Sequence, residues 1–241
     1  MRIIVCENYE EMSSKAAELV LAQVTLKPDS VLGFATGSTP LGLYEKLSDM
    51  CSSGQIDFSN TVSFNLDEYY PIKKDDPNSY YFYMHENLFS KINMKKENAH
   101  LLNGETDDSE SECENYERMI ERFGGIDMQI LGIVSNGHIG FNEPDSVMYP
   151  YTHTTNLTES TIKANSRFFN SVDEVPKKAM TVGILTILSV KRIILMANGA
   201  GKRQVISELL GDGIKLNLPA ALLKLHSDVT LICDKEAYPQ Q

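Results

Sequence analysis

Two patterns of hydrophobic and polar positions alternate along the chain. Short runs that are almost wholly apolar predict buried strands of a parallel sheet, and segments with apolar residues three and four positions apart predict helices. The predicted strands are residues 2–6, 30–35, 61–66, 128–133, 192–197 and 228–233. The predicted helices are residues 9–25, 40–52, 79–91, 109–123 and about 202–210.

This alternation predicts an α/β fold: a doubly wound, mostly parallel sheet with helices on both faces, as in Rossmann-like proteins. With 241 residues, of which 42% are hydrophobic, the chain is long and apolar enough for one domain spanning residues 1–241. Residues 145–178 follow neither pattern regularly. We expect them to form a lid or an added layer over the functional site.

The formal net charge of −11 argues against nucleic acid or an anionic membrane as a partner, because both require a basic surface. We find no apolar stretch long enough to span a bilayer and expect no signal peptide at the start. The four cysteines are scattered without a CxxC pair, which predicts reduced thiols and a cytoplasmic location. An anionic substrate would need a locally positive site.

The segment LGIVSNGHIGFNE, residues 131–143, places a polar cluster directly after a predicted strand. Open α/β sheets bind their ligands at the carboxyl ends of strands. Asn136, His138 and Glu143 supply an amide, an imidazole and a carboxylate, and such a set can transfer protons near neutral pH. The other histidines stand at no metal-ligand spacing from His138, so we expect no metal site.

The segment TGSTP joins the predicted strand 30–35 to the predicted helix 40–52. It offers hydroxyls, a flexible glycine and the N–H groups of a helix start, which together suit a phosphate group. The candidate phosphate ligands are Thr36, Gly37, Ser38 and Thr39. An ordinary strand–helix turn with a capping hydroxyl has the same sequence features, so the motif alone leaves both interpretations open.

Two cations are further candidates for a phosphate site. Lys202 follows two glycines at the start of a predicted helix. The nucleotide-binding P-loop pattern fails there, because Met196 and Arg203 replace the required glycine and hydroxyl residue. Arg167, in the segment ANSRFF, has a guanidinium that can bind phosphate with two parallel hydrogen bonds. By itself, Arg167 is better explained as a surface or packing residue.

The segment FNLDEY ends another predicted strand and contains two adjacent carboxylates, Asp67 and Glu68. Because neighbouring side chains of a strand point to opposite faces, we expect the two to differ in role, with one of them directed into the crevice. Without other information, a solvated strand end is the simpler interpretation of this pair.

Taken together, these segments resemble the glucosamine-6-phosphate deaminase family, also called glucosamine-6-phosphate isomerase. The resemblance rests on the strings TGSTP, FNLDEY, NGHIGFNEP, ANSRFF and VPKKAMTVG and on the pair Gly201 and Lys202. It extends from residue 1 to about residue 238. It implies conversion of D-glucosamine 6-phosphate and water into D-fructose 6-phosphate and ammonia, without a metal or organic cofactor.

The same resemblance implies a role for each candidate residue. Asp67 would move a proton from C2 to C1 of the opened sugar. His138 would open the sugar ring, supported by Glu143 and by Asn136, which orients its neighbours because an amide cannot ionise. The phosphate group would be held by Gly37, Ser38, Thr39, Arg167 and Lys202.

The chain departs from the family pattern at two informative positions. Val134 replaces a glycine found in many relatives, and we expect it to narrow the crevice unless its φ is negative. Tyr151 cannot supply the positive charge with which the regulated hexameric branch binds its activator, N-acetylglucosamine 6-phosphate. The chain also ends soon after Tyr238. We therefore expect a monomer, not a hexamer, that this activator does not regulate.

Three alternatives stay open. One is a 6-phosphogluconolactonase, which shares the fold and the phosphate loop. The second is a deaminase specific for galactosamine 6-phosphate, and the third is a non-catalytic sugar-phosphate sensor. The FNEP continuation after His138, together with intact Asp67 and Glu143, favours catalysis on an amino sugar.

Overall fold

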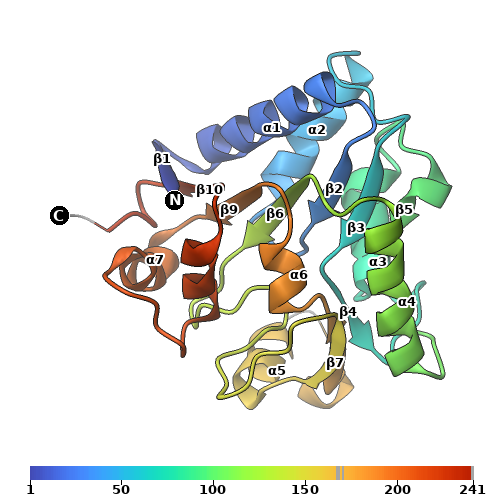
Figure 1. Ribbon diagram of the computed structural model, residues 1–241, viewed down its shortest axis with the longest axis vertical. Coiled ribbons are helices and arrows are strands. Elements are labelled where there is room, and N and C mark those ends of the chain that lie inside the picture. Colours follow the sequence, from blue (N-terminus) through green and yellow to red (C-terminus); the bar gives the residue numbers. More distant parts are fainter. Residues whose placement is uncertain (167–168, 170, 240–241) are drawn as a thin grey trace.

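The computed structural model describes residues 1–166, 169 and 171–239. Its main feature is a parallel sheet with the strand order β1-β10-β9-β6-β2-β3-β5 (Figure 1). These strands are β1 (Arg2–Cys6), β2 (Val31–Phe34), β3 (Val62–Asn65), β5 (Ala99–His100), β6 (Met128–Gly132), β9 (Ile193–Ala197) and β10 (Val229–Asp234). The predicted doubly wound α/β fold is confirmed.

Helices cover both faces of this sheet. They are α1 (Tyr9–Leu26), α2 (Leu41–Ser52), α3 (Tyr80–Met84), α4 (Ser109–Arg122), α6 (Ile184–Leu188) and α7 (Arg203–Leu210). A further helix, α5 (Glu159–Asn165), packs in a separate small cluster with Tyr69 and Phe141. The predicted helix 79–91 is α3 followed by a π-helical turn at His85–Phe89. Short 3-10 segments lie at Lys96–Asn98, Val172–Glu174, Ala200–Lys202 and Pro219–Leu225.

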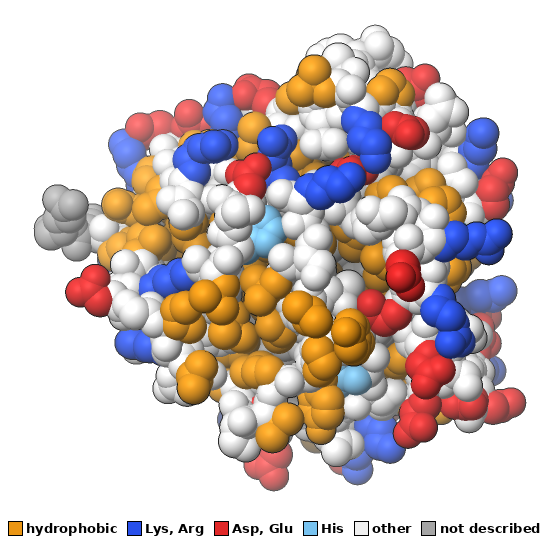
Figure 2. Space-filling model, viewed as in Figure 1, with side chains coloured by type: hydrophobic (Ala, Val, Ile, Leu, Met, Phe, Trp, Pro, Cys, Tyr) orange, Lys and Arg blue, Asp and Glu red, His pale blue; other side chains and the backbone are white. Residues whose placement is uncertain are grey.

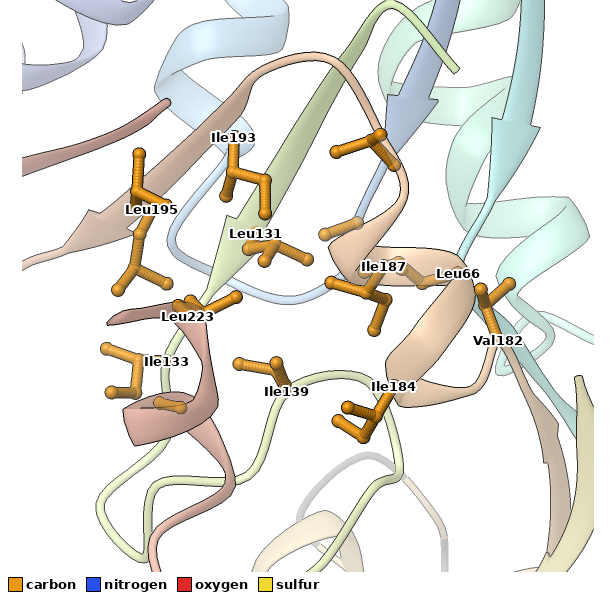
Figure 3. Close-up of a cluster of buried hydrophobic side chains, with 14 of the residues drawn as sticks. Leu66, Leu131, Ile133, Ile139, Val182, Ile184, Ile187, Ile193, Leu195 and Leu223 are labelled. Carbon is orange, nitrogen blue, oxygen red and sulfur yellow. The ribbon is translucent and has the colours of Figure 1, made fainter. Parts of the chain in front are cut away.

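The strands send alternate side chains into two hydrophobic cores, as the two-residue period of a strand requires. Ile130 and Ile194 pack with α1 and α2 on one face. Leu131 and Leu195 pack with α4, α6 and α7 on the other face. Figure 3 shows the part of this core around Leu131, Leu195 and Ile187 of α6. Since both faces of each central strand are buried, these strands are mostly apolar, and this explains why the sequence revealed them.

A small antiparallel sheet lies beside the large one, with the order β4-β8-β7. Its strands are β4 (Asp67–Tyr70), β7 (His153–Asn156) and β8 (Lys178–Thr181). Leu66 connects the two sheets: its N–H donates to the carbonyl oxygen of Phe34 at 3.1 Å, and its carbonyl accepts from the N–H of Val182 at 2.8 Å. The chain therefore leaves the large sheet one residue before Asp67.

The described residues between 145 and 178 contain β7 and α5 and form the expected added layer (Figure 1). Glu117 of α4 fixes this layer to the body of the protein. Its carboxylate accepts from the N–H of Thr152 at 2.7 Å and from the hydroxyls of Thr152 at 2.6 Å and Thr186 at 2.8 Å. Movement of the layer as a lid stays a prediction.

The surface mixes charges of both signs. On the face shown in Figure 2, Lys and Arg side chains lie among Asp and Glu around the edge, and hydrophobic side chains gather across the middle. Among the described residues, no helix combines the length and the hydropathy needed to cross a membrane.

Candidate active site

A cavity of about 620 Å³ lies at the carboxyl ends of β2 and β6, beside β4 and α5. Segments that are far apart in the sequence meet in its wall. The predicted site residues that line it are Thr36, Gly37, Ser38, Thr39, Asp67, Asn136, His138 and Lys202. Glu143 contacts His138 without lining the cavity. Arg167 lies outside the described residues.

The loop after β6 holds His138 between an amide and a carboxylate. Nδ1 of His138 lies 3.6 Å from Oε2 of Glu143, and both side chains are about nine-tenths buried, at 12% and 9% exposure. The Asn136 amide donates to Oε2 of Glu143 at 3.2 Å, and its oxygen accepts from the backbone N–H of His138 at 3.2 Å. Asn136 therefore connects the backbone of His138 to the carboxylate of Glu143, and its orienting role in catalysis stays a prediction.

Glycine is required inside the same loop. Gly137 has a φ of 80°, and a Cβ at this position would meet Cδ1 of Leu218 at 2.0 Å. The carbonyl of Gly137 also accepts from the N–H of Ala220 at 2.9 Å. The loop therefore packs against the 3-10 segment Pro219–Leu225 so closely that a side chain would displace His138.

Two threonines that the sequence analysis missed donate hydrogen bonds to Glu143. Oε1 of Glu143 accepts from the hydroxyl of Thr161 at 2.6 Å and from that of Thr158 at 2.9 Å. Burial opposes ionisation of Glu143, but the nearby His138 ring and both hydroxyls favour the anion and lower its pKa to about 2. Glu143 is thus a fixed negative charge beside the imidazole. In the sequence, Thr158 could have been recognised only as a helix N-cap, which is its position before α5.

Asp67 lines the same cavity from a buried position. Its side chain is 6% exposed, and Oδ1 has no hydrogen-bond partner within the described residues. Burial, with a smaller contribution from the charge of Glu68, raises the pKa of Asp67 to about 8. A buried carboxyl group with a raised pKa and a free oxygen is suited to accept a proton from a bound ligand.

Glu68 has a structural role. Its carboxylate accepts from the backbone N–H groups of Tyr69 at 2.9 Å, Tyr80 at 2.8 Å and Tyr81 at 2.8 Å, so it holds the start of α3. The interpretation of this pair as a solvated strand end is wrong, because Asp67 and Glu68 are both buried between the second sheet and α3. As expected, only one of the two, Asp67, lines the cavity.

The TGSTP loop forms another part of the wall. Gly37 has a φ of 102°, which side-chain-bearing residues rarely adopt. The backbone N–H groups of Ser38 and Thr39 donate no hydrogen bond within the described part of the chain. The predicted helix 40–52 included Pro40, but α2 begins at Leu41 and Pro40 is its N-cap. Unpaired N–H groups at the start of a helix can bind an anion.

Lys202 reaches the cavity from a turn fixed by Asp234. Gly199 starts this turn with a φ of 83° and donates its N–H to both carboxylate oxygens of Asp234, at 3.0 and 2.9 Å. The N–H of Ala237 donates to the same carboxylate at 2.8 Å. Asp234 is 5% exposed and ends β10. The sequence analysis missed this anchoring residue.

Val134 meets the condition under which no narrowing of the crevice was expected. No residue other than glycine has a positive φ among the described residues, so the backbone at Val134 is unstrained. Its side chain lines the cavity and is 36% exposed. Tyr151 is 57% exposed, and its carbonyl oxygen lies 2.9 Å from Nδ1 of His153.

Within the described residues, no cluster of His, Cys, Asp and Glu is arranged to hold a metal ion.

Comparison with known proteins places this site in a family. The family model described as glucosamine-6-phosphate isomerases/6-phosphogluconolactonase matches residues 7–232. The chain belongs to this family. The glucosamine-6-phosphate deaminase of Halothermothrix orenii is 54% identical over 237 residues, covering 98% of each chain. That of Clostridium botulinum strain Hall is 53% identical over 237 residues, covering 98% of this chain and 97% of the other.

Solved structures of the family show the same fold. A monomeric glucosamine-6-phosphate deaminase has a TM-score of 0.96 at 46% identity, with 98% of each chain covered. A 6-phosphogluconolactonase from Leishmania guyanensis has a TM-score of 0.75 at 21% identity, covering 98% of this chain and 97% of that one. The second likeness shows the shared fold alone, whereas the first combines the fold with 46% sequence identity over 98% of the chain.

Proposed function

We propose that this family member is a glucosamine-6-phosphate deaminase, which converts D-glucosamine 6-phosphate and water into D-fructose 6-phosphate and ammonia. The observation that carries the proposal is the placement of Asp67. A buried carboxyl with a free oxygen lines the same cavity as His138 and the TGSTP loop. Deaminases at 53% and 54% identity over nearly the full chain support the same reaction.

His138 and Asp67 carry out separate proton transfers. His138, held by Asn136 and the permanently charged Glu143, opens the pyranose ring by proton transfer at the ring oxygen and the C1 hydroxyl. Asp67 then removes the C2 proton and returns it at C1, which leaves an imine at C2 after rearrangement. Water adds at C2 and ammonia departs. Positioned proton transfers of this kind contribute roughly 10²–10⁴-fold in rate.

The phosphate group is assigned to the Thr36–Thr39 loop and Lys202, which line the cavity together. Arg167 is proposed as a second cation at this position, although it lies outside the described residues. Two cations beside free backbone N–H groups would hold a phosphate dianion despite the net charge of −11. No metal or organic cofactor has a step in this mechanism.

We further propose that residues 1–241 act as one catalytic unit and function as a monomer in the cytoplasm. The monomeric deaminase at 46% identity supports the monomer, and free thiols at all four cysteines support the location. Light scattering after gel filtration tests the oligomeric state. A sigmoidal rate curve that N-acetylglucosamine 6-phosphate abolishes would contradict the expected absence of regulation.

The reaction is tested by offering the purified protein glucosamine 6-phosphate, galactosamine 6-phosphate and 6-phosphogluconolactone separately. Ammonia and fructose 6-phosphate should form from the first substrate. Ammonia from the galactosamine epimer alone would change the assigned substrate, and acid release from the lactone alone would make the protein a lactonase. Ligand binding without any product would make it a sensor.

A further inference from the structure

Two tyrosines hold the TGSTP loop from outside the sequence motif. The hydroxyl of Tyr83 donates to the carbonyl oxygen of Gly37 at 2.6 Å. The hydroxyl of Tyr9, in the first turn of α1, lies 3.1 Å from the carbonyl oxygens of both Ser38 and Thr39. Consecutive carbonyls of the loop are therefore bound by phenol groups from two separate parts of the chain.

Tyr9 also reaches the start of the following helix. Its oxygen accepts from the N–H of Gly42 at 2.7 Å. A Cβ at Gly42 would lie 2.5 Å from Oγ of Ser13 and 3.0 Å from Cε1 of Tyr9. The start of α2 thus lies directly against α1, and this close approach brings the Tyr9 hydroxyl within reach of the loop.

The planar peptide bond converts these contacts into control of the N–H groups. In a trans peptide unit the carbonyl and the next N–H point in opposite directions. Tyr83 holds the carbonyl of Gly37, which directs the N–H of Ser38 away from the phenol. Tyr9 does the same for the carbonyl of Ser38 and the N–H of Thr39. Both N–H groups donate to no described residue, and both residues line the cavity.

We propose that Tyr9 and Tyr83 are positioning residues that preset the Ser38 and Thr39 N–H groups for the substrate phosphate. This inference deepens the proposed function and rests on it for the identity of the phosphate ester. Binding to a preset loop avoids the cost of ordering the loop at the moment of binding. The tyrosines act on phosphate affinity, and the proton transfers at Asp67 and His138 do not involve them.

Single substitutions Tyr83→Phe and Tyr9→Phe remove one hydroxyl each and keep the rings. Tyr81→Phe is the matched control, because Tyr81 lies in the same helix as Tyr83 and its hydroxyl makes no hydrogen bond within the described residues. For each variant we would measure kcat and KM with glucosamine 6-phosphate, and the Kd of inorganic phosphate by calorimetry. Thermal unfolding checks that each variant is folded.

Tyr83→Phe should raise both KM and the phosphate Kd about fivefold, the usual effect of one lost hydrogen bond, and leave kcat within about twofold. Tyr9→Phe should act in the same direction, and Tyr81→Phe should change neither. Unchanged phosphate affinity in both variants, or an equal loss in Tyr81→Phe, would overturn the inference. If the wild-type protein releases no ammonia, the proposed reaction fails, while the phosphate titrations still decide the role of the tyrosines.

Discussion

Asp67 and Glu68 are consecutive residues of β4 whose carboxyl groups serve opposite sides of the strand. Asp67 presents a free oxygen to the cavity, whereas Glu68 accepts three backbone N–H groups at the start of α3. The negative charge of Glu68 also contributes to the raised pKa of Asp67. One strand therefore supplies both a reactive carboxyl and the group that helps to keep it protonated.

Asp67→Asn should lower kcat at least about 10²-fold, because an amide cannot accept the C2 proton. Binding should persist, so the Kd of inorganic phosphate should stay within about twofold. The measurement is ammonia release under saturating glucosamine 6-phosphate, with phosphate binding as the control. A variant that retains more than about a tenth of the wild-type kcat would remove Asp67 from the mechanism.

The same substitution should stabilise the protein at alkaline pH. Burial raises the pKa of Asp67 from 3.8 to about 8, so the folded state loses stability as the pH rises between these two values. Asn carries no such cost. Asp67→Asn should therefore raise Tm at pH 9 by at least about 2–4 °C, which corresponds to about 1 kcal/mol in a domain of this size. Near pH 4 the two proteins should unfold at similar temperatures.

The rate should depend on pH through the same carboxyl group. Asp67 must be ionised to act as a base, so kcat/KM should increase as the pH rises towards about 8 and then level off. Glu143, with a pKa of about 2, stays ionised throughout this range. Titration of the substrate itself is followed separately by phosphorus NMR and subtracted. A profile that is flat between pH 6 and 9 is incompatible with Asp67 as the base.

Thr161→Val should impair ring opening by removing a hydrogen bond to Glu143. The Thr161 hydroxyl donates to Oε1 at 2.6 Å, and hydrogen bonds to charged groups are worth roughly 1.5–3 kcal/mol. We expect kcat/KM for the cyclic substrate to fall about tenfold. Thr155→Val in β7 is the control, because its hydroxyl contacts the carbonyl of Asn156 and not the site. Equal kinetics for the two variants would contradict this role.

Asp234→Asn should weaken substrate binding through the turn that carries Lys202. The amide would keep one acceptor for the Gly199 N–H and lose the charge and the second oxygen. KM should rise about tenfold, with kcat within about twofold, because the reacting carbons lie elsewhere. Asp228→Asn is the control at the other end of the same strand, where the carboxylate pairs with Arg192. A KM that is unchanged in Asp234→Asn would show that the turn holds its shape without the carboxylate.

The central strands were predicted because both of their faces are buried. β9 is apolar at every position, β6 is apolar except at Gln129 and Gly132, and both strands enter both cores, so their signal does not depend on alternation. The small sheet was missed for the opposite reason. Its strands, DEYY, HTTN and KAMT, contain no apolar run and are four residues each. Their pairing depends on neighbours that are distant in the sequence, such as Thr181 opposite both Asp67 and His153.

The sequence by itself determined the large sheet apart from its edge strand β5, the loops that follow its strands and the chemical types of the candidate groups, because local apolar patterns and short motifs encode these features. Tertiary structure alone decided which groups meet. Thr161 joins Glu143, Tyr83 joins Gly37 and Asp234 joins Gly199 across long stretches of chain. Contacts of this kind, and the burial that raises the pKa of Asp67, arise only when separate elements pack against one another.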